Sequence, residues 1–142
     1  CSPSRACLLT GRNHHAVGMR AVSNFDTGFP NMRGRIDPAA ATIAEVLQPA
    51  GWATFCVGKW HLAPMREASA AGPFSDWPVQ RGFDRFYGFM QGETDHFHPE
   101  LYADNHMVEQ PTAQSRCEAV ERPRRHRACL RLPAPRGVRC VS

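Results

Sequence analysis

The first apolar and polar pattern in the chain predicts a short helix with a signal at each end. Between Cys1 and Gly11, small and apolar residues follow an opening Ser2 and Pro3. We expect Ser2 to cap the first turn, where Pro3 is tolerated because the N–H that it lacks would have no helical partner. Gly11 favours the left-handed conformation that ends helices. Cys1 is therefore predicted to lie at a helix N-terminus.

A second helix is predicted further along the chain. Thr42 and Glu45 have the spacing of a capping box, and apolar positions recur at helical intervals after them. This pattern predicts a helix over residues 43–50, kinked near Pro49 and closed by Gly51. Its apolar face is expected to consist of Ile43, Val46, Leu47 and Ala50.

The apolar, β-favouring residues 52–57 follow this helix and predict a buried strand. A helix followed by a buried strand is a repeating step of α/β sheets, so residues 58–62 are expected at the carboxyl end of that strand. This is the edge where open α/β sheets bind ligands. The segments 12–41 and 63–82 are rich in turn-forming residues and are expected to be loops.

Composition is that of an ordinary globular domain, but charge divides the chain. Of 142 residues, 42% are hydrophobic and 21% charged, and no apolar run approaches the roughly 20 residues of a membrane span. We therefore expect no membrane partner.

Residues 1–111 hold nine basic and eleven acidic side chains, whereas residues 112–142 hold eight arginines and two glutamates. A domain boundary is thus expected near Pro111.

Two pairs of residues could carry chemistry. Cys1 and Arg5 lie one helical turn apart, near a helix end whose free N–H groups attract anions. Lys59 is the only lysine among 17 basic residues, and it lies two residues before His61. On an extended segment these two side chains point the same way and would place a cation and an acid–base group on one side of a site.

These motifs resemble those of the sulfatase family. The resemblance rests on Cys1–Arg5 with the Leu-Thr-Gly-Arg that follows, on Gly58–Leu62, and on the aromatic block 81–89, and it covers roughly residues 1–111. It implies an alkaline-phosphatase-like α/β fold with a mixed central sheet flanked by helices, present here as an incomplete, N-terminal-side fragment of a catalytic domain. The true N-terminus is expected to be absent, because the chain begins with Cys1 rather than Met.

The resemblance also implies a mechanism and its residues. In sulfatases the motif cysteine is oxidised to formylglycine by a formylglycine-generating enzyme, which would make Cys1 the nucleophile. The resemblance further implies that Arg5 stabilises the formylglycine and the negative charge that develops in the reaction. It also implies that Lys59 binds the sulfate oxygens. His61 binds the formylglycine hydroxyl and moves its proton. A calcium ion would bind the formylglycine oxygen of residue 1; the family's aspartate and asparagine ligands belong to regions that this fragment does not contain.

The expected activity is therefore hydrolysis of a small sulfate ester by an arylsulfatase, with the fragment inactive on its own. One alternative is a phosphonate monoester or phosphodiester hydrolase of the same superfamily. The other is a non-catalytic protein that binds nucleic acid through the arginine run at residues 122–127. We do not expect nucleic acid as a partner, because no aromatic residue interrupts that run.

Two further features concern the tail and the cell compartment. The tail at residues 112–142, rich in Arg, Pro and Cys, has the composition of a disordered segment or of an out-of-frame reading of GC-rich DNA. The six cysteines form no regular disulfide pattern, which is compatible with a reducing cytoplasm, although no targeting segment identifies the compartment.

Overall fold

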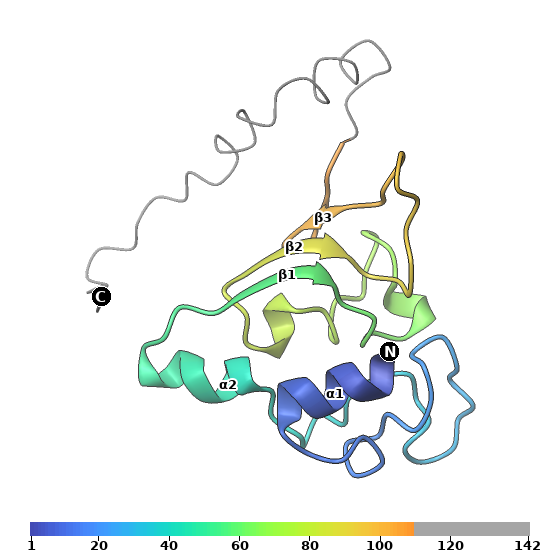
Figure 1. Ribbon diagram of the computed structural model, residues 1–142, viewed down its shortest axis with the longest axis vertical. Helices are drawn as coiled ribbons and strands as arrows, with labels where there is room; N and C mark the ends of the chain where they lie inside the picture. The colour runs from blue at the N-terminus through green and yellow to red at the C-terminus, as the bar shows by residue number, and fades with distance from the viewer. Residues whose placement is uncertain (110–142) are drawn as a thin grey trace. The chain divides into compact units, whose positions relative to one another are not determined.

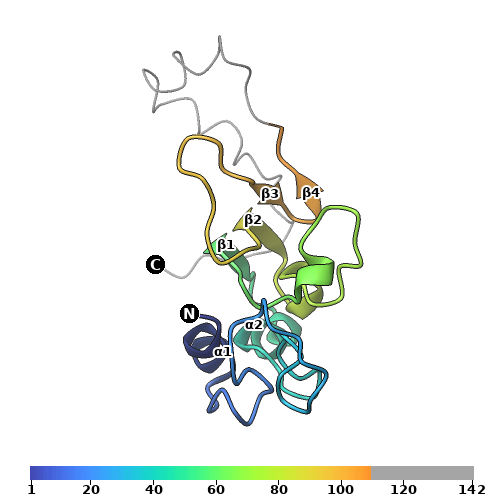
Figure 2. The same cartoon turned by 90° about the vertical axis from the view of Figure 1, so that its right-hand side faces the viewer.

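The computed structural model describes residues 1–109, and Cys1–Val108 form one compact unit. Two helices lie on the same side of a small sheet (Figures 1 and 2). The helices are α1 (Ser2–Thr10) and α2 (Ile43–Leu47), and the strands are β1 (Phe55–Lys59), β2 (Arg85–Phe89), β3 (Tyr102–Ala103) and β4 (His106–Met107). No helix in this part of the chain is long and apolar enough to cross a membrane. The predicted tail, residues 112–142, lies outside the described residues.

The sheet is mixed, as expected. β1 and β2 pair in parallel, while β2, β3 and β4 form an antiparallel meander in the order β1-β2-β3-β4. The hydrophobic core lies between this sheet, the helices and the loops that connect them. Its largest buried side chains are Trp60, Trp77, Met19, Ile36 and Leu62.

Helix α1 has the predicted position but not the predicted cap. Cys1 is the N-cap residue, a proline occupies the first turn, and Gly11 closes the helix in the left-handed conformation with φ 66°. The prediction that Ser2 caps the helix is wrong. The Ser2 side chain is fully buried, and its Oγ accepts a hydrogen bond from the backbone N–H of Ser23 at 3.1 Å, so the hydroxyl attaches the following loop to the helix.

Helix α2 begins with the predicted capping box but is shorter than predicted. The Thr42 hydroxyl accepts from the Glu45 N–H and the Glu45 carboxylate accepts from the Thr42 N–H. The α-helix ends at Leu47, and Gln48–Ala50 form a 3-10 turn instead, because a proline there removes a helical hydrogen bond. The expected apolar face is wrong too: Ala44 is buried, whereas Ile43 and Val46 are 52% and 62% exposed.

The predicted strand 52–57 is displaced along the chain. β1 starts at Phe55 and continues to Lys59, and it pairs on one side only, with β2, among the described residues. The prediction of a buried strand is wrong for the described residues, because Phe55 and Val57 are 55% and 78% exposed. Cys56, which lies between them, packs against the core as a free thiol.

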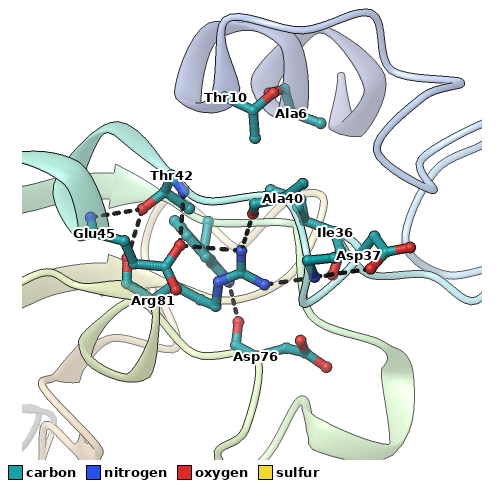
Figure 3. A network of polar contacts seen from close by, with 11 residues as sticks. Ala6, Thr10, Ile36, Asp37, Ala40, Thr42, Glu45, Asp76 and Arg81 are labelled. Carbon is teal, nitrogen blue, oxygen red and sulfur yellow. Dashed lines mark hydrogen bonds and ion pairs between the residues drawn. The ribbon is translucent and has the colours of Figure 1, made fainter.

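A buried arginine joins the loop before α2 to the turn before β2 (Figure 3). The Arg81 guanidinium donates to the carbonyl oxygens of Ala40 and Ile36 and pairs with the Glu45 carboxylate at 3.2 Å. Its own carbonyl oxygen accepts a hydrogen bond from the Thr42 hydroxyl at 2.7 Å. The helix cap and the buried cation thus form one polar network.

We expect Arg81→Met to lower the free energy of unfolding by about 3 kcal/mol, because it leaves two buried carbonyl oxygens without this donor and removes the cation that pairs with Glu45. Arg85→Met is the control, since Arg85 pairs with Asp104 at the surface and its loss should cost less than about 1 kcal/mol. Urea denaturation measures both. Equal losses in the two variants would contradict the network's role.

Candidate active site

The structure brings the two predicted motifs together at the N-terminus of α1. The Cys1 Sγ atom lies 3.0 Å from the Lys59 Nζ atom and 3.0 Å from the His61 Nδ1 atom. Lys59 is the last residue of β1 and His61 lies just beyond it. A cation and an acid–base group therefore contact one nucleophilic position, although 58 or more residues separate them from it along the chain.

In this chain Arg5 contacts the backbone beside the site rather than the side chain of residue 1. Its Nε donates to the Trp60 carbonyl oxygen at 2.7 Å, and its terminal nitrogen donates to the Lys59 carbonyl oxygen. The guanidinium thus holds the end of β1 against α1 and adds positive charge beside residue 1. Partial burial lowers the pKa of Arg5, with a smaller opposing effect from Cys56.

The backbone around His61 is folded tightly. The prediction of an extended segment from Lys59 to His61 is wrong at its end, because His61 has φ 53°, in the left-handed region that non-glycine residues rarely adopt. Its N–H donates to the Met90 carbonyl oxygen at 2.9 Å, which continues the pairing of β1 with β2. The turn redirects the imidazole, so that it still reaches Cys1.

Gly92 forms the wall behind the imidazole and the lysine. A Cβ atom at position 92 would lie 2.9 Å from the Cε1 atom of His61, closer than real Cβ atoms approach, so only glycine fits against the ring. The Gly92 carbonyl oxygen also accepts a hydrogen bond from the Lys59 Nζ atom at 2.5 Å. The loop after β2 therefore restrains both side chains.

The environment of His61 favours the neutral imidazole. Burial is the largest cause, followed by the positive charges of Lys59, of the N-terminal ammonium of Cys1 and of Arg5; together they lower the pKa of His61 to about 4. At neutral pH the ring therefore keeps a lone pair that can accept a proton.

The described residues do not form a metal site by themselves. No group of three or more His, Cys, Asp or Glu side chains within residues 1–109 is arranged to hold a metal ion. The only expected calcium ligand among them is residue 1. A single ligand leaves the expected calcium ion as a proposal for the whole catalytic domain. In the loop between β2 and β3, Asp95 accepts hydrogen bonds from the N–H groups of Phe97 and His98 and so forms a turn.

Sequence reasoning missed Asn24. Its Oδ1 atom lies 2.5 Å from the His61 Nε2 atom, on the side of the ring opposite Cys1. Asn24 lies in the irregular segment between α1 and α2, 37 residues before His61, and no local pattern marks it. Only the tertiary contact identifies it.

The chain is similar to known proteins along most of its length. The sulfatase family model matches residues 1–121. Steryl-sulfatase of Mus musculus is 39% identical over 89 residues, which cover 62% of this chain and 14% of that protein. Arylsulfatase of Klebsiella aerogenes is 33% identical over 102 residues, which cover 70% of this chain and 20% of that protein. The chain thus spans a fifth or less of the length of these relatives.

Solved structures share the fold. Ps i-CgsB superposes with a TM-score of 0.57 at 22% identity, over 85% of this chain and 29% of that one. A sulfatase structure from work on glycosaminoglycan metabolism by Bacteroides thetaiotaomicron superposes with a TM-score of 0.50 at 30% identity, over 78% of this chain and 22% of that one. The described residues therefore form part of an alkaline-phosphatase-like α/β fold.

We expect an NMR titration of the His61 ring protons to have its midpoint near 4, and Lys59→Met to raise that midpoint by removing a neighbouring positive charge. Arg12→Met removes an exposed cation beyond the other end of α1 and should leave the midpoint unchanged. The folded pKa lies below the unfolded value of about 6.5, so the unfolded state binds more protons between these values. His61 thus makes stability rise with pH across that window, and a midpoint at 6.5 would contradict this.

Proposed function

Since the chain belongs to the sulfatase family, we propose that it carries the nucleophile side of a sulfuric ester hydrolase that acts through formylglycine at position 1. The observation that supports this proposal is the approach of Lys59 Nζ and His61 Nδ1 to Cys1 Sγ, each at 3.0 Å. The activity is proposed for the whole catalytic domain, because this chain spans only part of the relatives' length.

The Cys1 Sγ atom marks where an oxygen of the modified residue would lie. A formylglycine-generating enzyme would supply the oxidant that converts the thiol-bearing carbon of Cys1 to an aldehyde, with loss of the thiol sulfur. One hydroxyl of the aldehyde hydrate would attack the sulfur of the ester while the alcohol leaves, and loss of the proton of the second hydroxyl would re-form the aldehyde and expel sulfate. Position 1 is suited to this chemistry because it lies at the N–H end of a nine-residue helix, where the backbone attracts an anion.

The neighbouring side chains have distinct proposed roles. The Lys59 ammonium binds the sulfate oxygens, and its compact charge stabilises the additional negative charge of the transition state. His61 accepts the proton of the hydroxyl at position 1 through Nδ1, which the low pKa of the ring leaves unprotonated. Arg5 holds the backbone of Lys59 and of Trp60, the residue between Lys59 and His61, and adds to the positive potential.

The substrate is proposed to be a small sulfate ester. The relatives' names include a steryl-sulfatase and an arylsulfatase, and one structural neighbour was solved in complex with a neocarrahexaose. These names concern those proteins, and the contacts in this chain concern the sulfate group alone. An aryl sulfate is therefore the appropriate first substrate. It contains the sulfate ester that all these substrates would share, and its aryl alcohol is a good leaving group.

The first test addresses the modification. After coexpression with a formylglycine-generating enzyme, an aldehyde-specific aminooxy probe should label the peptide that contains Cys1, as detected by mass spectrometry. Cys1→Ala should abolish the label. Cys7→Ala is the matched control, because Cys7 lies on the same helix but away from Lys59 and His61, and it should keep full labelling. Labelling that survives in Cys1→Ala would exclude position 1 as the aldehyde.

The second test addresses the lysine. In a protein that carries the whole catalytic domain, Lys59→Met should lower kcat/KM for an aryl sulfate by roughly 10²- to 10³-fold, the usual effect of losing one preorganised donor to transition-state charge. Arg12→Met controls for a general loss of positive charge and should change it little. Efficient turnover of an aryl phosphonate with none of the aryl sulfate would contradict the proposal and favour the related phosphonate hydrolases.

A further inference from the structure

The two ring nitrogens of His61 have different partners, which determines where the ring proton lies. Nδ1 faces the Cys1 Sγ atom at 3.0 Å, and Nε2 lies 2.5 Å from the Asn24 Oδ1 atom. An amide oxygen can only accept a hydrogen bond, so Nε2 must be the nitrogen that donates. In a neutral imidazole only one nitrogen carries a proton, which leaves the lone pair on Nδ1.

The orientation of the Asn24 amide is itself supported by a second contact. Its Nδ2 atom lies 3.5 Å from the sulfur atom of Met65. A thioether sulfur is an acceptor without a proton, so it pairs with the amide nitrogen and not with the amide oxygen. Rotating the amide by half a turn would place oxygen against sulfur, lose the hydrogen bond to Met65, and leave Nε2 as an acceptor with the ring proton on Nδ1.

Asn24 is also attached to the helix that carries position 1. The preceding residue, Ser23, is 2% exposed, and its N–H donates to the buried Oγ atom of Ser2 at 3.1 Å. Gly34 packs against the Ser23 carbonyl oxygen so closely that a Cβ atom at position 34 would lie 2.4 Å from it. The backbone before Asn24 is thus fixed relative to Cys1 by contacts on both sides.

We propose that Asn24 is a positioning residue that acts through His61: its side-chain oxygen keeps the ring proton on Nε2 and so directs the lone pair of Nδ1 toward residue 1. The effect on turnover rests on the proposed function, because it matters only if Nδ1 accepts a proton from the nucleophile. A base oriented in this way by a third group is a recurring arrangement in nucleophilic catalysis.

A purely structural hydrogen bond would have a different signature. If Asn24 only attached the loop, its loss would change stability but not the tautomer of His61. Gly92 would still pack against the ring, and the Met90 carbonyl oxygen would still hold the backbone N–H of His61. The position of the ring proton therefore separates the two roles, and it can be observed without any turnover.

The primary experiment is a long-range ¹H–¹⁵N correlation spectrum of histidine-labelled protein at neutral pH, with His61 assigned by its loss in His61→Ala. The wild type should show the Nε2–H tautomer, and Asn24→Ala should shift the population toward Nδ1–H. Asn24→Asp retains an acceptor oxygen and should keep Nε2–H. Asn13→Ala is the matched control, because Asn13 is a loop asparagine whose Oδ1 accepts from the His15 N–H. A wild-type Nδ1–H tautomer, or an Asn24→Ala spectrum like that of the control, would overturn the proposal.

Kinetics on the modified, whole catalytic domain provide the second measurement. Asn24→Ala should lower kcat for an aryl sulfate by roughly 10- to 100-fold with little change in KM, which is part of the roughly 10²- to 10⁴-fold contribution of a general base. Asn24→Asp should restore most of that loss. Unchanged kcat in Asn24→Ala, in an active enzyme, would overturn the positioning role. Absence of sulfatase activity in the wild type would instead contradict the proposed function and leave the tautomer test intact.

Discussion

The attachment of α1 to the end of β1 by Arg5 is the contact on which the site depends. Arg5 donates to the carbonyl oxygens of Lys59 and Trp60, so a side chain from the first helix binds the backbone of a strand more than 50 residues away. Without it, nothing in the backbone pairing of the sheet would determine the distance from Cys1 to Lys59 or His61. The fold thus uses a charged side chain to align the two motifs that form the candidate site.

Local signals in the sequence predicted the end of α1 and the start of α2 well, but they predicted the end of α2 and the buried surfaces poorly. Gly11 and the capping box of Thr42 and Glu45 act within a few residues, so their effect is visible in the sequence. The face that α2 buries depends on its neighbours, and only Ala44 meets the core. Periodicity identifies an apolar stripe but not whether another element covers it.

The candidate site shows the same division. Cys1, Arg5, Lys59 and His61 could be singled out because each lies in a compact motif. Asn24 could not, because its role comes from a contact across 37 residues through a loop without periodicity. Ser2 looked like a helix cap and instead fixes that loop through the Ser23 N–H. In both cases tertiary packing determined the role of a small polar side chain whose residue type suits several roles.

The cationic surroundings of residue 1 have a consequence for the end of a reaction cycle. Lys59 and Arg5 place positive charge beside the nucleophile whether or not an organic group is attached to the anion. Their attraction for a sulfate ester would extend to free inorganic sulfate, which carries more negative charge than the ester. Inorganic sulfate would therefore dissociate slowly from such a site and would inhibit it as a product. An interaction that stabilises the substrate, the transition state and the product equally increases affinity but does not increase the rate of the chemical step.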